Sequence, residues 1–260
     1  MRALMYREFR ETWVLVVGIV AAVAVMALVE HGYLNFDSQS KVASFVGAQC
    51  VWIMALLLGG RIIARESDRR RGFFSSLPLS VGKLFAVKSA IAFVAFAALT
   101  VAIFFTTHTS VFQGEAIFDS LWFDKEGPLG TLLVWISIFL GAAFASVVTR
   151  STVSALVGGI FTAIGVDIIA IAVQTLVLRG SYIRFWEAQL ATGSPYQVPL
   201  HEFLSFVVAV CCFMAGAWAF TRTPILEHRK RRIRALVGAL ALGSVAATAC
   251  AYGLSVVLPT

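Results

Sequence analysis

The feature that most constrains this chain is a series of seven long apolar stretches separated by polar segments. A helix that crosses the hydrocarbon core of a bilayer needs about 20 apolar residues. Only helices and closed barrels satisfy every backbone group in lipid, and these stretches are continuous rather than alternating, as barrel strands would be. The sequence therefore predicts an all-α, polytopic transmembrane helix bundle with spans at residues 13–29, 42–64, 84–106, 129–148, 153–178, 203–220 and 235–258.

The composition argues against a soluble protein. Charged residues make up 13% of the chain and hydrophobic residues 59%, which leaves too few charges for the water-facing shell of a soluble domain. The four cysteines all lie inside apolar stretches, so a secreted disulfide framework is not supported.

The net charge of +7 comes from Lys and Arg residues that are unevenly divided between alternate loops. If the N-terminus is cytoplasmic, all but four of these 21 residues fall on the inner side, where basic residues accumulate. The four exceptions are Lys41, Lys125, Arg179 and Arg184. The basic excess thus indicates topology rather than nucleic-acid binding, and an odd number of spans places the C-terminus outside. A cleaved signal peptide is the alternative for the first stretch.

The segment between the second and third spans, residues 65–83, divides into a charged half and an apolar half. Its charged half extends the second span until Gly72, since glycine readily ends a helix. The apolar side chains that follow are expected to dock on a partner or on the membrane surface, and Ser80 is expected to cap a helix that begins around Val81. The candidate contact residues are Glu66, Arg69, Gly72, Phe73, Phe74, Leu77, Pro78 and Leu79.

This segment resembles the corresponding part of the membrane subunit of type-2 ABC exporters. The resemblance rests on Glu66, Gly72, the run Ser-Leu-Pro-Leu-Ser at 76–80, and Lys83 or Lys88 at the start of the third span. It covers about residues 1–222, as a six-span permease core. In that family the segment carries the coupling helix, which docks on the nucleotide-binding subunit.

The resemblance implies a homodimer or pseudo-dimer of permeases with separate ABC ATPase subunits, in a bacterial cytoplasmic membrane. The chain departs from the family in two places. The outer loop at about 107–128 is long, and residues 223–260 add a basic connector and a seventh span.

The chain carries none of the motifs that would make it an enzyme. Its Gly82-Lys83 pair lacks the preceding glycine and the following Ser or Thr of a P-loop. Hydrolase signatures are absent, and the four histidines lack metal-ligand spacing. We therefore expect no catalytic residues, cofactor or metal site in this chain, with ATP and Mg²⁺ held by the partner subunit.

Asp167 lies near the centre of the fifth predicted span, where a charged side chain costs about 2.5–3.5 kcal/mol. It shares a helical face with Gly159, Ala163, Ala170 and Gln174. We expect this small, polar face to look into the bundle or a dimer interface rather than lipid. Asp167 and Gln174 are candidates for the translocation path. The alternative is an Asp167 that only fixes helix packing, because the sequence offers it no obvious intramembrane base.

The last predicted span has a small residue at every fourth position: Ala235, Ala239, Gly243, Ala247 and Ala251. Such a pattern permits close helix contact, either within the chain or at a dimer interface. The basic run at 229–234 before it anchors the inner leaflet or binds anionic lipid or a partner.

Two classes of function remain open at this point. The first is the permease subunit of an ATP-driven exporter, and the second is a non-transporting multi-pass membrane sensor or assembly scaffold, whose basic loops bind lipid or a regulator. A stand-alone proton-driven transporter that uses Asp167 is a further alternative.

Overall fold

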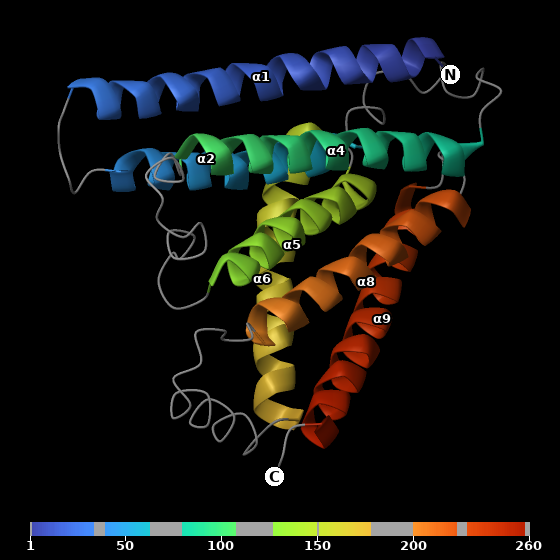
Figure 1. The fold of residues 1–260 in the computed structure, drawn as a ribbon. Coiled ribbons are helices and arrows are strands. Elements are labelled where there is room, and N and C mark those ends of the chain that lie inside the picture. The colour runs from blue at the N-terminus through green and yellow to red at the C-terminus, as the bar shows by residue number, and fades with distance from the viewer. Residues whose placement is uncertain are drawn as a thin grey trace, which may run out of the picture.

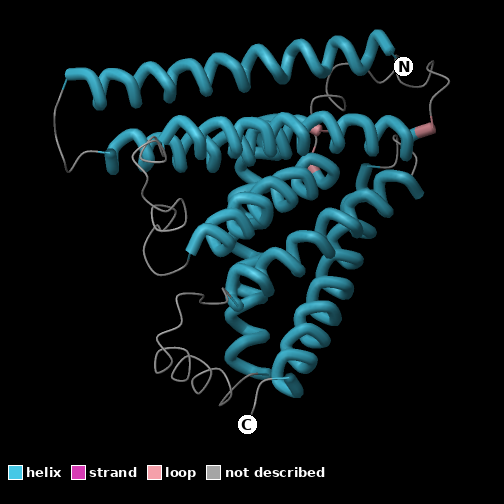
Figure 2. Tube along the Cα trace, viewed as in Figure 1, coloured by secondary structure: helices cyan, strands magenta, loops and turns pink. Residues whose placement is uncertain are grey.

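The structure is a computed structural model, and it describes residues 2–33, 40–62, 80–107, 127–149, 151–177, 200–222 and 228–257. Every regular element within these ranges is an α-helix, which confirms the all-α prediction for the described residues. The helices are α1 (Arg2–Tyr33), α2 (Ser40–Arg61), α4 (Val81–Thr107), α5 (Gly127–Val148), α6 (Thr152–Val177), α8 (Leu200–Arg222) and α9 (His228–Val257). Figure 2 shows that they account for nearly all of the described chain.

Four of these helices contain stretches long and apolar enough to cross a membrane, judged by length and composition. They are Gly82–Ile103 in α4, Thr152–Val173 in α6, His201–Arg222 in α8 and Arg229–Cys250 in α9. The described parts of α1, α2 and α5 contain shorter apolar stretches, at Thr12–Val25, Gln49–Arg61 and Leu132–Val148. The fold is therefore that of a helical membrane protein in its coarse features, with four of the seven predicted spans supported by this measure.

The helices form two groups that cross one another (Figure 1). The first group is α1, α2 and α4, which contact one another and lie along a common direction in this view. In the second group, α6 and α9 run steeply across that direction, and α8 runs obliquely. Helix α5 contacts α2, α6, α8 and α9, so it joins the two groups.

The central position of α5 follows from its sequence. Residues 138–148 are buried on every side of the helix, as expected for a helix that is apolar all round. The hydroxyl group of Ser146 in this buried stretch has a hydrogen-bond partner in the same helix, because it donates to the carbonyl oxygen of Ala143 at 2.7 Å. Phe139 stacks on Phe96 of α4, with ring centroids 5.1 Å apart.

Glycine permits the close contact between α2 and α5. A Cβ atom at Gly59 would lie 2.5 Å from the carbonyl oxygen of Phe139 and 2.9 Å from the Cβ of Ala142. Gly159 of α6 also meets Ala142, which would lie 3.1 Å from a Cβ at that glycine. Small residues of this kind let helix backbones approach closely in membrane proteins. Three helices thus meet around one alanine.

The small residues of α9 pack within the chain, which is one of the two alternatives that the sequence left open. The buried members are Ala235, Ala239, Gly243 and Ala247. A Cβ at Gly238 would lie 3.3 Å from the Cβ of Ala215 in α8, and a Cβ at Gly243 would lie 3.4 Å from Val208. The side chain of Ala251 lies outside the described residues.

Replacing Gly59 with leucine is expected to destabilise the protein. The new side chain would overlap the backbone of α5 at Phe139, which cannot move without displacing that helix. Overpacking of a filled contact costs about 1–3 kcal/mol, so the Tm of the purified protein in detergent should fall.

The matched control is Gly165→Leu in α6, because no atom lies within 4 Å of a Cβ at that glycine. This variant should keep the Tm of the unmodified protein. An equal fall in both variants would contradict the packing argument.

Candidate functional site, a polar cluster between α6 and α8

The predicted contact residues from Glu66 to Leu79 lie outside the described residues, but the structure describes both ends of their segment. Helix α2 ends at Arg61, and α4 begins at Val81. The backbone N–H of Lys83 donates to the side-chain oxygen of Ser80 at 3.4 Å. This is the N-cap that the sequence predicts, because an N-cap side chain accepts a hydrogen bond from the first turn.

The start of α4 packs against the end of α8. Phe85 lies between Phe213 and Phe220, with ring centroids 5.6 Å from each. The guanidinium of Arg231 in α9 lies 5.3 Å from the centre of the Phe220 ring, a cation–π contact that suits an arginine with 2% of its surface exposed. The start of α4, the end of α8 and the start of α9 therefore meet at one end of the structure.

The same end gathers basic side chains. Exposed cations at these helix termini are Lys83, Arg222, Arg229, Lys230, Arg232 and Arg234. On the α1 side, Thr12 of α1, Arg61 of α2 and Lys88 of α4 line a common hollow. The end of α2, the start of α4, the end of α8 and the start of α9, which the sequence assigns to the cytoplasm, thus lie in one region. We name this region the basic end.

Asp167 lies elsewhere, just past the middle of α6. The sequence predicts that its face looks into the bundle or a dimer interface, and within this chain the Asp167 side chain is not inside the bundle. The predicted inward face is right for Gly159 and Ala170, which are buried. However, Val166 takes the buried position between them, and the side chain of Asp167 is 58% exposed. Asp167 is one residue away from the buried stripe, which turns it by about 100° toward the edge that adjoins α8. The side chain of Gln174 lies outside the described residues.

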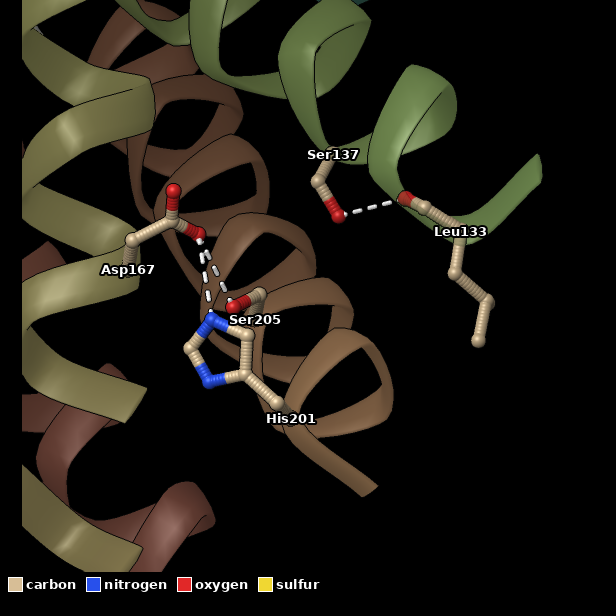
Figure 3. Close-up of polar contacts among 5 residues, drawn as sticks. All are labelled: Leu133, Ser137, Asp167, His201 and Ser205. Atoms are coloured by element: carbon tan, nitrogen blue, oxygen red, sulfur yellow. Dashed lines mark hydrogen bonds and ion pairs between the residues drawn. The ribbon is translucent and has the colours of Figure 1, made fainter. Parts of the chain in front are cut away.

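Two residues of α8 contact the carboxyl group of Asp167 (Figure 3). The hydroxyl of Ser205 donates to Oδ1 of Asp167 at 3.0 Å, and Nε2 of His201 lies 4.0 Å from the same oxygen. His201 and Ser205 are four residues apart in α8, so they share one face of that helix. The distance to His201 is too long for a hydrogen bond, and it is a charge pair when the imidazole is protonated.

The sequence did not predict this cluster. His201 stands at the beginning of a span with no second His or Cys at metal-ligand spacing, and Ser205 is one of many hydroxyl residues in apolar stretches. The one sequence signal that could have indicated this cluster is the four-residue spacing of a histidine and a serine on one helix. Their acidic partner is 38 residues away from Ser205 in the chain, and only the packing of α6 on α8 brings it close.

The cluster combines a carboxylate, an imidazole and a hydroxyl group, which together can bind a proton or a cation. An exposed carboxylate at mid-helix depth is costly against lipid, so this edge is suited to water or to another protein surface. Among the described residues, no group of three or more His, Cys, Asp or Glu side chains could hold a metal ion. Comparisons with protein-family models, curated proteins and solved structures found no match for this chain.

A double-mutant cycle measures the bond between the two helices. We expect Ser205→Ala to lower the free energy of unfolding by about 1 kcal/mol, because the Asp167 carboxylate loses a donor. The same change should cost little in an Asp167→Ala background. Unfolding in mixed micelles gives the four free energies.

Ser137→Ala is the matched control, since the Ser137 hydroxyl donates to the carbonyl oxygen of Leu133 in its own helix (Figure 3). Its effect should be the same with or without the Asp167 carboxyl group. A coupling of zero between Ser205 and Asp167 would contradict the cluster.

Proposed function

We propose that this chain is the membrane-spanning permease subunit of an ATP-driven exporter. It forms the translocation path as a homodimer or pseudo-dimer and is coupled to separate ABC ATPase subunits, which hold ATP and Mg²⁺. The observation that supports the proposal best is the position of the two anchors of segment 63–79. Ile62 directly follows the last residue of α2 and Ser80 directly precedes the first residue of α4, and these two helix ends lie at the basic end.

The proposal includes an orientation. All seven helices cross a bacterial cytoplasmic membrane, with the N-terminus and the basic end in the cytoplasm and the C-terminus outside. Basic residues favour the cytoplasmic side of a membrane, which supports this choice. In this orientation the proposal assigns segment 63–79 to the cytoplasm, where the ATPase subunit would contact it, as the resemblance to type-2 exporters implies. Residues 1–222 form the exporter core, and 223–260 add the connector and the last span.

The contacts of α2 and α4 supply a route for mechanical force. A push on segment 63–79 acts on α2, which is in backbone contact with α5 through Gly59. The same push acts on α4, whose Phe85 is packed on α8 through Phe213 and Phe220. Because packed helices move as rigid bodies rather than deform, closure of the ATPase pair would displace α5 and α8 together.

The edge between α6 and α8 is our candidate for the translocation path. Asp167 is exposed there and is held from α8 by Ser205. Exposing the Asp167 carboxyl group to lipid would cost free energy, which favours a position for this edge beside water or beside the second permease. Movement of α8 relative to α6 would alter the contacts of this carboxyl group, and Gln174 follows two turns later on the same helix.

Charge reversal at Glu66, or a tryptophan at Gly72, is expected to lower the ATPase activity of the purified complex several-fold. Both changes alter the proposed contact with the ATPase subunit, while membrane insertion should be unaffected. The experiment purifies the chain in mild detergent together with the ATP-binding subunit that the proposal requires, and measures phosphate release and membrane content.

Glu115→Lys is the charge-matched control, because this residue belongs to the loop expected on the outer side. Its ATPase rate should equal that of the unmodified complex. If the chain co-purifies with no ATP-binding subunit, the exporter proposal fails. The result would then favour the alternative, a membrane sensor or assembly scaffold.

A further inference from the structure

The edge of α6 that adjoins α8 presents one negative charge on an apolar surface. Asp167 is the only charged residue in α6, and its side chain is 58% exposed. Ile164 and Ile171 lie three residues before it and four residues after it, so all three share one face of the helix. Both isoleucines are about half exposed. A molecule that lies against this edge therefore meets a carboxylate between two apolar side chains.

The carboxylate is held in place from α8 but keeps one oxygen for a ligand. Ser205 is buried, and its hydroxyl donates to Oδ1 of Asp167 at 3.0 Å. Nε2 of His201 lies 4.0 Å from the same oxygen. The second oxygen points away from both residues (Figure 3), and within the described part of the chain it has no hydrogen bond or ion pair. The protein thus orients this acceptor outward without using all of its capacity.

The chemistry of this edge favours an organic cation over a metal ion. Ca²⁺ and Mg²⁺ take about six or more oxygen ligands, whereas this edge offers one carboxylate whose neighbouring hydroxyl already donates to it. No group of three or more His, Cys, Asp or Glu side chains within the described ranges could hold a metal ion. An organic cation needs only one opposite charge, and its apolar body can contact Ile164 and Ile171.

The depth of Asp167 suits a molecule with a charged head and an apolar body. Asp167 lies six residues, or about 9 Å, before Val173, at which the apolar stretch of α6 ends. His201 is the first residue of the apolar stretch of α8. The carboxylate is therefore closer to the end of both stretches than to their middle. Amphipathic groups keep their charge toward the headgroups and their carbon chain in the hydrocarbon, and opposite charges attract more strongly there than in water.

We propose that this edge binds amphipathic organic cations, and that such cations are the substrate class of the proposed exporter. Asp167 binds the positive group, Ser205 orients the carboxylate, and Ile164 and Ile171 contact the apolar body. Movement of α8 relative to α6 would turn the carboxylate and so change its affinity for the cation. The assignment as substrate rests on the proposed function, whereas the binding is a property of this chain alone.

The test uses the purified full-length protein in a neutral detergent, without an ATPase subunit. Equilibrium dialysis gives the Kd for tetraphenylphosphonium and for tetraphenylborate, two ions of the same shape and opposite charge, after correction for uptake by protein-free micelles. Asp167→Asn removes the charge and keeps the size of the side chain. This variant should bind tetraphenylphosphonium about tenfold more weakly, and its Kd for tetraphenylborate should not rise.

Glu115→Gln is the matched control, because it makes the same chemical change in the loop expected on the outer side. This variant should bind tetraphenylphosphonium as the unmodified protein does. An equal loss in the Glu115 variant would show only general attraction between charges and would overturn the site. Unchanged tetraphenylphosphonium binding in Asp167→Asn, or an equal loss for both ions, would overturn it too.

A second pair of variants keeps the test valid if Asp167→Asn fails to fold. Ile171→Ala should weaken tetraphenylphosphonium binding about threefold. Val153→Ala, at an exposed apolar residue about five turns earlier on the same helix, should leave it unchanged. Equal effects of these two changes would overturn the proposal. Because no measurement involves ATP, failure of this test leaves the ATPase coupling standing, and absence of an ATPase partner leaves the cation site standing.

Discussion

The rest of the structure depends on the contact of α2 with α5 at Gly59, because this contact connects the group of α1, α2 and α4 to the other helices through a close backbone approach. In lipid the burial of apolar area gives little reason for helices to associate, so close packing must supply the attraction. Gly59, Ala142 and Gly159 make that packing possible. The completely buried stretch of α5 is the consequence, because helices cover it on all sides.

Polar groups are treated differently in two parts of this framework. At the basic end, exposed cations can reach water or lipid headgroups, and the guanidinium of buried Arg231 lies over the Phe220 ring. On α6, the exposed carboxyl group of Asp167 accepts a hydrogen bond from the hydroxyl of Ser205 in the neighbouring helix α8. The first arrangement suits a surface that faces headgroups and a cytoplasmic partner. The second holds an ionisable group at an open edge, where a substrate or a proton could reach it.

Features that depend on local sequence were predicted correctly. The helices, the Ser80 cap of α4 and the capacity of the α9 small residues for close contact all follow from neighbours a few residues apart. Features that depend on which helices meet were not predictable. Periodicity alone put Asp167 on a face expected to look into the bundle or a dimer interface, whereas within this chain Val166 takes the buried position and Asp167 is largely exposed. The partner of Asp167 and the burial of Lys88 were missed for the same reason, because both are set by contacts between helices far apart in sequence.

The central claim is that segment 63–79 receives force from a separate ATPase subunit. Site-specific photo-crosslinking tests this most directly, with a photoreactive amino acid in place of Phe73 in membranes that contain the complete complex. The account predicts a covalent product with the ATP-binding subunit whose yield changes when ATP is added, and no such product from a probe at Phe118 in the predicted outer loop. Crosslinks from Phe73 to lipid alone, or equal ATPase crosslinking from both positions, would contradict it.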